Sequence, residues 1–307
     1  MAKKSVLIRF ELKNYLRIVA ITLITVLVFW FLFRKIDFRG VLGILSSADV
    51  FYLLLAFILT LVFPLLVALR WKLLVSGLDY DLDFWKSLSM IFGTFPINAI
   101  TPSKAGDVIK VFFLRKHIIK SKVLGAVICE RLFDLAFLVL LCFFGVFTLD
   151  SVFILVLAAF VFVASLVAFL ALSINWRFKS DFFSRLKDFQ ACFKEIRKDA
   201  SLVLFISLIT LVVWILAVVQ SFVFFLALGV QIPFTTVLTG MPIAIFIGLI
   251  PITLGGMGTR DAAIIYMFSD FASSAQLLGV GLLFSFFRYW ILSLFGLPFL
   301  HRHMQRK

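Results

Sequence analysis

The sequence alternates long apolar runs with short polar or basic stretches, and the runs have the length of membrane spans. A helix needs about 20 mostly apolar residues to cross the hydrocarbon core. Two apolar segments, residues 84–114 and 234–268, are interrupted by proline and glycine. Uninterrupted runs predict six full spans, at residues 16–33, 50–69, 123–149, 152–174, 202–228 and 275–300. This pattern predicts an all-α fold, a polytopic membrane helical bundle of about eight elements.

Composition supports the membrane interpretation. The 307 residues are 63% hydrophobic and 15% charged, whereas a soluble domain is about half apolar and a quarter charged. We expect residues 1–307 to form a single integral membrane domain. Residues 175–199 space aromatic and aliphatic side chains among Lys and Arg, which predicts a cytoplasmic amphipathic linker between two halves. That linker either lies in the membrane interface or packs as a plain helix on the bundle.

The formal net charge of +14 does not predict nucleic-acid binding, because most Lys and Arg residues flank apolar spans. Five lie in residues 1–17, six in 104–122, seven in 177–198 and three after position 301. Cytoplasmic loops carry such an excess. We therefore expect a multi-pass protein of the cell (plasma) membrane with cytoplasmic N- and C-termini, although Arg34, Lys35 and Arg39 do not follow this pattern.

This orientation predicts how the interrupted segments enter the membrane. Residues 84–114 would enter from the cytoplasm and return there, and residues 234–268 would enter from outside and return outside. Two re-entrant or broken helices in an inverted-repeat arrangement are typical of transporters that bind substrate near the bilayer midplane. Non-helical backbone at that depth must be satisfied by protein or water, so both breaks should be buried in the bundle.

The second break carries a glycine-rich turn followed by a charged pair. Gly255, Gly256 and Gly258 precede Arg260 and Asp261. A glycine turn before a helix N-terminus can present backbone N–H groups to an anion, and Arg260 adds a planar charge. The alternative interpretation is a flexible hinge, and one element can serve as both.

The first break carries the matching polar residues Asn98, Lys104 and Asp107. We expect Asp107 near the N-terminus of a half-helix, where a carboxylate is favourable. The later Lys110 and Arg115 are interpreted as peripheral charges on the cytoplasmic side.

Two spans carry charged residues inside apolar sequence. Glu130, Arg131 and Asp134 fall within 123–149, and Arg288 falls within 275–300. Ionisable groups in a span pair with one another or face a polar cavity. Glu130, Arg131 and Asp134 form either a structural ion cluster or an arginine site held by carboxylates. Arg288 would pair with Asp261 or with a ligand phosphate.

The residues that carry this chemistry resemble a known family. Their order, from Asn98 and Asp107 through Glu130, Arg131 and Asp134 to Arg260 and Asp261, is similar to the flippase-like family. This family comprises the transmembrane region of lysylphosphatidylglycerol synthases and its stand-alone relatives, which often have Glu where this chain has Asp107 and Asp261. The resemblance implies movement of an aminoacylated phospholipid between leaflets. We expect no soluble aminoacyltransferase domain in these residues, so synthase activity is not carried over.

The residues and the resemblance together predict a protein that binds and translocates an anionic phospholipid or a polyprenyl-linked lipid. Arg131, Arg260, Arg288, Asn98, Lys104 and the three glycines would bind substrate, supported by the carboxylates Asp107, Glu130, Asp134 and Asp261. No metal, cofactor or nucleic acid is expected. The sequence contains no nucleophile–base constellation, which argues against an enzyme. A membrane transferase on a lipid substrate, or a non-catalytic subunit of such an enzyme, remains an alternative. The expected partners are the anionic lipid and the membrane, and a homodimer or a partner enzyme stays open as a protein partner.

Overall fold

The computed structural model describes residues 38–143, 152–173, 190 and 192–305, and at 38–39, 102–104, 152–158 and 173 it describes the backbone alone. The first predicted span and most of the predicted linker at 175–199 lie outside the described residues. The elements are α2 (Phe38–Ser46), α3 (Val50–Ser76), α4 (Phe84–Ile100), η1 (Pro102–Ile109), α5 (Lys110–Leu114), α6 (Lys120–Cys142), α7 (Val152–Ser173), α9 (Ala200–Ala227), α10 (Phe234–Leu249), η3 (Leu254–Gly256), α11 (Thr259–Met267), α12 (Ser274–Ser285), η4 (Phe286–Ile291) and α13 (Leu292–Gln305).

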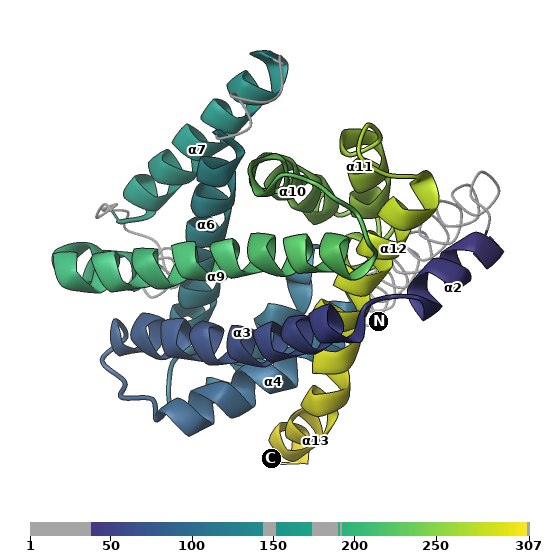
Figure 1. The fold of residues 1–307 in the computed structure, drawn as a ribbon. Coiled ribbons are helices and arrows are strands. Elements are labelled where there is room, and N and C mark those ends of the chain that lie inside the picture. Colours follow the sequence, from purple (N-terminus) through teal and green to yellow (C-terminus); the bar gives the residue numbers. More distant parts are fainter. Residues whose placement is uncertain (1–37, 144–151, 174–189, 191, 306–307) are drawn as a thin grey trace, which may run out of the picture.

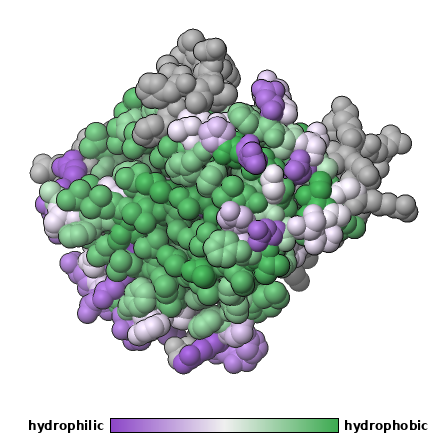
Figure 2. Space-filling model, in the orientation of Figure 1, coloured by the Kyte–Doolittle hydropathy of each residue, from purple (hydrophilic) through white to green (hydrophobic). Residues whose placement is uncertain are grey.

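The described part is an all-α membrane bundle, which confirms the predicted fold class. Among the described residues, three helices are long and apolar enough to cross a membrane: Val50–Ser76, Ala200–Ala227 and the continuous helix Ser274–Gln305. Large apolar side chains on the outer faces of α3 and α9 are exposed, among them Phe51, Leu54, Leu204 and Phe205. Figure 2 shows the resulting broad apolar face, with hydrophilic residues gathered at its edges. Lipid, rather than water, suits such a surface.

Polar side chains cap the long helices where the apolar runs begin. Asp49 accepts from the N–H of Phe51 at the start of α3, and Asp83 accepts from two N–H groups at the start of α4. Asp199 caps α9, where the Ser201 hydroxyl and two backbone N–H groups donate to it and lower the pKa of its carboxyl. Each cap satisfies N–H groups that a helix leaves without partners.

Both predicted interruptions are confirmed. The first segment is α4, then the 3-10 helix η1 and the short helix α5; the second is α10, η3 and α11. The helices that precede them, α3 and α9, lie side by side although about 150 residues separate them (Figure 1). The breaks also meet, because the Gly255 N–H points to the Thr101 carbonyl at 3.4 Å. The inverted relation between the halves stays a prediction.

The last span differs from an ordinary helix. Between α12 and α13, η4 is a π-helical turn that contains Arg288 and Tyr289. Such turns are rare and frequently occur at functional sites. The sequence pattern predicted the span and gave no signal for the widened turn. The effect of the widened turn is local, because a π turn changes the direction in which the side chains of that turn and the next one point.

Candidate functional site

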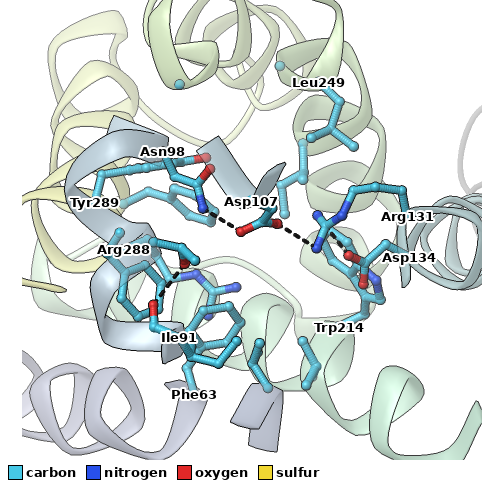
Figure 3. Close-up of a pocket in the computed structure, with 18 of the residues that line it drawn as sticks. Phe63, Ile91, Asn98, Asp107, Arg131, Asp134, Trp214, Leu249, Arg288 and Tyr289 are labelled. Atoms are coloured by element: carbon cyan, nitrogen blue, oxygen red, sulfur yellow. Dashed lines mark hydrogen bonds and ion pairs between the residues drawn. The ribbon is translucent and has the colours of Figure 1, made fainter. Parts of the chain in front are cut away.

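One cavity lies between the two broken segments and is lined by both halves of the chain. Arg70, Asp107, Arg131 and Asp134 line it from the first half, and Arg260 and Arg288 line it from the second. Figure 3 shows Asn98, Asp107 and Arg131 in a row, with Arg288 on the neighbouring wall beside Phe63. The cavity is narrow, since a water-sized sphere can be centred in only about 60 Å³ of it. That space holds a few water molecules.

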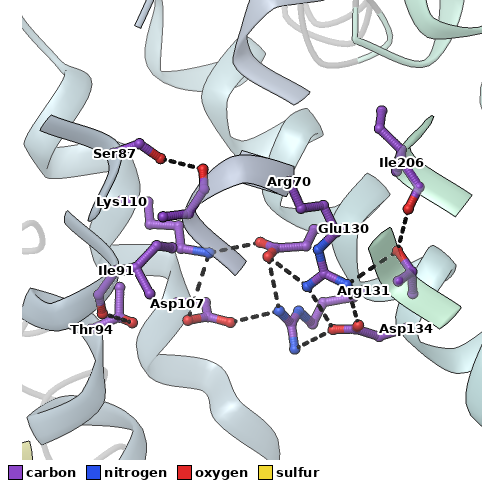
Figure 4. A network of polar contacts seen from close by, with 12 residues as sticks. Arg70, Ser87, Ile91, Thr94, Asp107, Lys110, Glu130, Arg131, Asp134 and Ile206 are labelled. Atoms are coloured by element: carbon purple, nitrogen blue, oxygen red, sulfur yellow. Dashed lines mark hydrogen bonds and ion pairs between the residues drawn. The ribbon is translucent and has the colours of Figure 1, made fainter. Parts of the chain in front are cut away.

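Arg70 of α3 lies at the centre of the first charged network (Figure 4). Its guanidinium donates to Asp134 Oδ1 at 2.6 Å and to Glu130 Oε1 at 2.8 Å, both on α6, and reaches Thr210 Oγ1 of α9 at 3.3 Å. Sequence reasoning missed this residue. Arg70 directly follows the predicted span at residues 50–69, and Lys72 follows two residues later, so both resemble ordinary positive charge at a membrane boundary and the signal for a buried partner was weak.

Arg131 joins the same network from the side of the cavity. Its guanidinium contacts Asp107 Oδ2 at 2.8 Å and Asp134 Oδ2 at 2.9 Å, and its side chain is 24% exposed. Asp107 also accepts from the Asn98 amide at 2.8 Å. Two carboxylates therefore already neutralise Arg131, which favours the structural ion cluster for this part of the site.

Lys110 corrects one interpretation. The sequence suggested a peripheral cytoplasmic charge, but the side chain is buried and its Nζ contacts Glu130 Oε2 at 2.7 Å. It also lies over the Trp71 ring at 4.4 Å. The reason is the break itself: η1 turns the chain so that α5 begins against α6, and Lys110 then faces the bundle.

Arg260 and Asp261 form the second charged group, at the start of α11. Arg260 Nη2 contacts Asp261 Oδ1 at 2.9 Å and donates to Ser285 Oγ at 2.6 Å, and both charged side chains are buried. The other oxygen of Asp261 accepts from the Gly258 N–H at 2.8 Å. That N–H, which the glycine turn was expected to offer to an anion, therefore already has a partner.

Steric constraints also explain why the turn consists of glycine. Gly255, Gly256 and Gly258 all have positive φ. At Gly256 a Cβ would collide with the backbone carbonyl of Gly248, so α10 and the turn approach too closely for any other residue. Of the three glycines, Gly255 lines the cavity, and Gly256 and Gly258 shape the turn behind it.

Arg288 differs from the other arginines. The sequence offered Asp261 as its protein partner, but Asp261 pairs with Arg260. Within the described residues no Asp or Glu forms an ion pair with Arg288. Its guanidinium lies over the Phe63 ring at 3.9 Å, and Nη1 points to Gln220 Oε1 at 3.4 Å. Arg288 is buried, and it faces the cavity.

The charges of the two groups do not cancel. Among the described residues of the two charged groups, with Arg288 included, there are five cations and four carboxylates. The cations are Arg70, Lys110, Arg131, Arg260 and Arg288, and the carboxylates are Asp107, Glu130, Asp134 and Asp261. Each carboxylate contacts at least one of the first four cations. The excess positive charge therefore lies at Arg288.

The structure brings most of the predicted residues together. Glu130 and Asp261 lie directly behind the lining, bonded to arginines that reach it, and the side chain of Lys104 is outside the described residues. In the described ranges no group of three or more His, Cys, Asp or Glu could hold a metal ion. Predicted residues in the lining are Asn98, Asp107, Arg131, Asp134, Gly255, Arg260 and Arg288.

Gly281→Ala tests the close packing around the second charged group. A Cβ at Gly281 of α12 would lie 2.5 Å from Asp261 Oδ1, so the carboxylate must move away from Arg260. Overpacking of this kind costs about 1–3 kcal/mol, and we expect a lower melting temperature in detergent. The matched control is Gly279→Ala on the same helix, where only the end of the Leu228 side chain, at 2.9 Å, must give way. Equal melting temperatures for the two variants would contradict the prediction.

A helical bundle with membrane-length helices and a charged cavity between two broken segments defines an integral membrane protein. Comparison with known sequences then gives the family. The sequence model of the lysylphosphatidylglycerol synthase TM region matches residues 17–296. The chain belongs to this family, as its motifs predicted.

Its relatives include proteins named UPF0104 membrane protein. One from Pyrococcus horikoshii is 24% identical, with 93% of this chain and 96% of the relative covered. One from Archaeoglobus fulgidus is 27% identical over 84% of this chain and 88% of the relative. One from Methanothermobacter thermautotrophicus is 25% identical over 73% and 77%. The similarity extends over most of the length of these three proteins.

Proposed function

We propose that this protein binds the phosphate-bearing head group of an anionic lipid in the cavity and moves it between the leaflets. The observation that carries the proposal is Arg288, the cation for which the described residues provide no carboxylate. A buried charge without a counter-ion is costly. A phosphate oxygen pair fits a guanidinium in bidentate geometry, so a phosphodiester would neutralise the excess charge.

The surroundings of Arg288 favour an anion there. Arg260 and Arg288 both lie over the ring of Phe284, at 4.3 Å and 5.6 Å from its centroid. Two guanidinium groups thus approach one part of the wall, and only Arg260 is neutralised. Water is largely excluded by apolar neighbours, and electrostatic attraction is stronger in such an environment.

Movement of a head group requires the cavity to widen, since the present space holds only a few water molecules. The two broken segments touch at Gly255 and Thr101, and both breaks lie beside the cavity. Sliding of one segment past the other would widen the polar path between Arg131 and Arg288. This role as a hinge is compatible with the positive-φ glycines at the second break.

The transferase alternative has less support. Its general base would be Asp107 or Asp261, and both carboxylates contact arginines, at 2.8 Å and 2.9 Å. Both oxygens of each carboxylate already have protein donors, which leaves less room to accept a substrate proton. The donors are Asn98 and Arg131 at Asp107, and Arg260 and the Gly258 N–H at Asp261. The other alternative, a non-catalytic subunit of a membrane transferase, depends on residues 175–199, most of which lie outside the described residues.

The test is lipid transport by the purified protein in proteoliposomes. We expect fluorescent phosphatidylglycerol or a fluorescent polyprenyl phosphate to exchange between leaflets faster than in protein-free vesicles, as measured by dithionite quenching. The two anionic probes distinguish a glycerolipid from a polyprenyl carrier, and phosphatidylcholine serves as the zwitterionic comparison. Exchange of both anionic probes at the protein-free rate, or equal rates for all three lipids, would contradict the proposal.

A further inference from the structure

A second hollow lies beside the charged cavity, between α6, α9 and the end of α10; we refer to it as the side groove. It shares four lining residues with the cavity, namely Arg131, Asp134, Trp214 and Leu249. The rest of its lining is apolar and consists of Leu135, Phe246, Ile250 and Pro251. The groove is wider than the cavity, because a water-sized sphere can be centred in about 340 Å³ of it. The two hollows therefore adjoin at these four residues, with the charged cavity on the inner side and the mainly apolar groove on the outer side.

The outer part opens to the surface of the bundle. Ile250 is 44% exposed and Pro251 is exposed at the point where α10 ends. The exposed side chains next to this opening are apolar: Ile252 follows Pro251, and Ile215 of α9 follows Trp214. Such a surface suits lipid chains rather than water. We therefore expect the side groove to open toward lipid.

The exposure of Arg131 distinguishes it from the other cations of its network. Its side chain is 24% exposed, whereas Arg70 and Lys110 are almost fully buried. A charged side chain near hydrocarbon is costly unless polar groups reach it, and Asp107 and Asp134 already contact Arg131. This partly exposed ion pair keeps the junction of groove and cavity polar, so a polar head group can pass there.

We propose that the side groove is the lateral opening through which the lipid enters the cavity, and that it holds an acyl or prenyl chain while the phosphate lies at Arg288. This inference rests on the proposed function. Its occupant follows from adjacency and chemistry: a phosphate and an apolar chain in one molecule match a charged cavity that adjoins an apolar groove. A soluble phosphate compound would use the cavity alone.

The experiment fills the groove after the protein has folded. Ile250→Cys places a thiol in the outer lining, and Leu208→Cys, on the exposed face of α9, is the matched control. The native cysteines Cys129, Cys142 and Cys192 are buried, which limits background labelling. Methyl and benzyl methanethiosulfonate then attach groups of increasing size, and dithiothreitol removes them. Phosphatidylglycerol exchange and binding of glycerol phosphate by calorimetry are measured on each sample.

We expect the benzyl group at position 250 to slow lipid exchange at least about tenfold and the methyl group to slow it less. Binding of glycerol phosphate should stay within about twofold, dithiothreitol should restore exchange, and labelled Leu208→Cys should behave as the unlabelled protein. Unchanged exchange with the benzyl group would overturn the lateral opening and leave the proposed function intact. Equal loss of glycerol phosphate binding would assign the groove to the head group and overturn the chain site. Unmodified protein that neither binds glycerol phosphate nor exchanges lipid would overturn both proposals.

Discussion

Arg288→Gln is expected to slow exchange of anionic lipid by about 10- to 100-fold while leaving the protein at least as stable as the wild type. A hydrogen bond to a charged partner contributes about 1.5–3 kcal/mol, and each 1.4 kcal/mol changes an equilibrium constant about tenfold. Stability should not fall, because Arg288 is the buried cation without a carboxylate among the described residues, and glutamine keeps a polar group near Gln220. The measurements are dithionite quenching in proteoliposomes and melting temperature in detergent.

A purely structural role for Arg288 would give the opposite pair of results. In that case the melting temperature would fall and any exchange by folded protein would continue. Arg288→Lys provides the intermediate variant, because it keeps the charge and loses the planar fork that binds phosphate in bidentate geometry. We expect exchange between the wild-type and glutamine rates. Wild-type exchange in Arg288→Gln would contradict the assigned role.

Arg70→Ala should have the largest effect on stability. Its guanidinium neutralises Glu130 and Asp134 in the interior of the bundle. Without Arg70, the carboxylates Asp107, Glu130 and Asp134 share only two cations, so one buried negative charge is left uncompensated, and removal of one partner from a buried ion pair costs about 3–5 kcal/mol. We expect a marked fall in melting temperature and in the yield of folded protein in detergent. The control Arg115→Ala removes an exposed arginine directly after α5 and should change stability by no more than about 0.5 kcal/mol.

The variant Arg70→Ala also distinguishes an effect on stability from an effect on lipid transport. Lys110 and Arg131 still contact the two carboxylates in Arg70→Ala, at Glu130 and Asp134 respectively. The variant that folds should therefore keep a charged cavity. A melting temperature equal to that of Arg115→Ala would mean that the network contributes little to folding.

Much of this architecture is visible in the sequence because the bilayer constrains it strongly. Apolar runs of membrane length must be helices, since no water satisfies the backbone. Proline and glycine then marked the places where α4 and α10 end, at Ile100 and Leu249. Charged residues inside spans, such as Arg131 and Arg288, pointed to the cavity because such groups require a polar environment.

The partners of those charges could not be predicted, because they depend on contacts between distant segments. Arg70 is 60 residues from Glu130, and Gln220 is 68 residues from Arg288. A lone polar residue in an apolar run carries no sign of the helix it will face. Lys110 was misread for the same reason, since its direction depends on the turn in η1. The π turn around Arg288 likewise depends on packing.

The arrangement of charges has a consequence for how substrate range can change within the family. Every carboxylate in the two charged groups is engaged by a cation other than Arg288. A substitution at this one position therefore alters the electrical preference of the path and leaves the supporting ion pairs in place. Under the proposed function, one substitution at Arg288 would shift the preference from acidic toward zwitterionic lipids without rebuilding the scaffold that keeps charge inside a membrane.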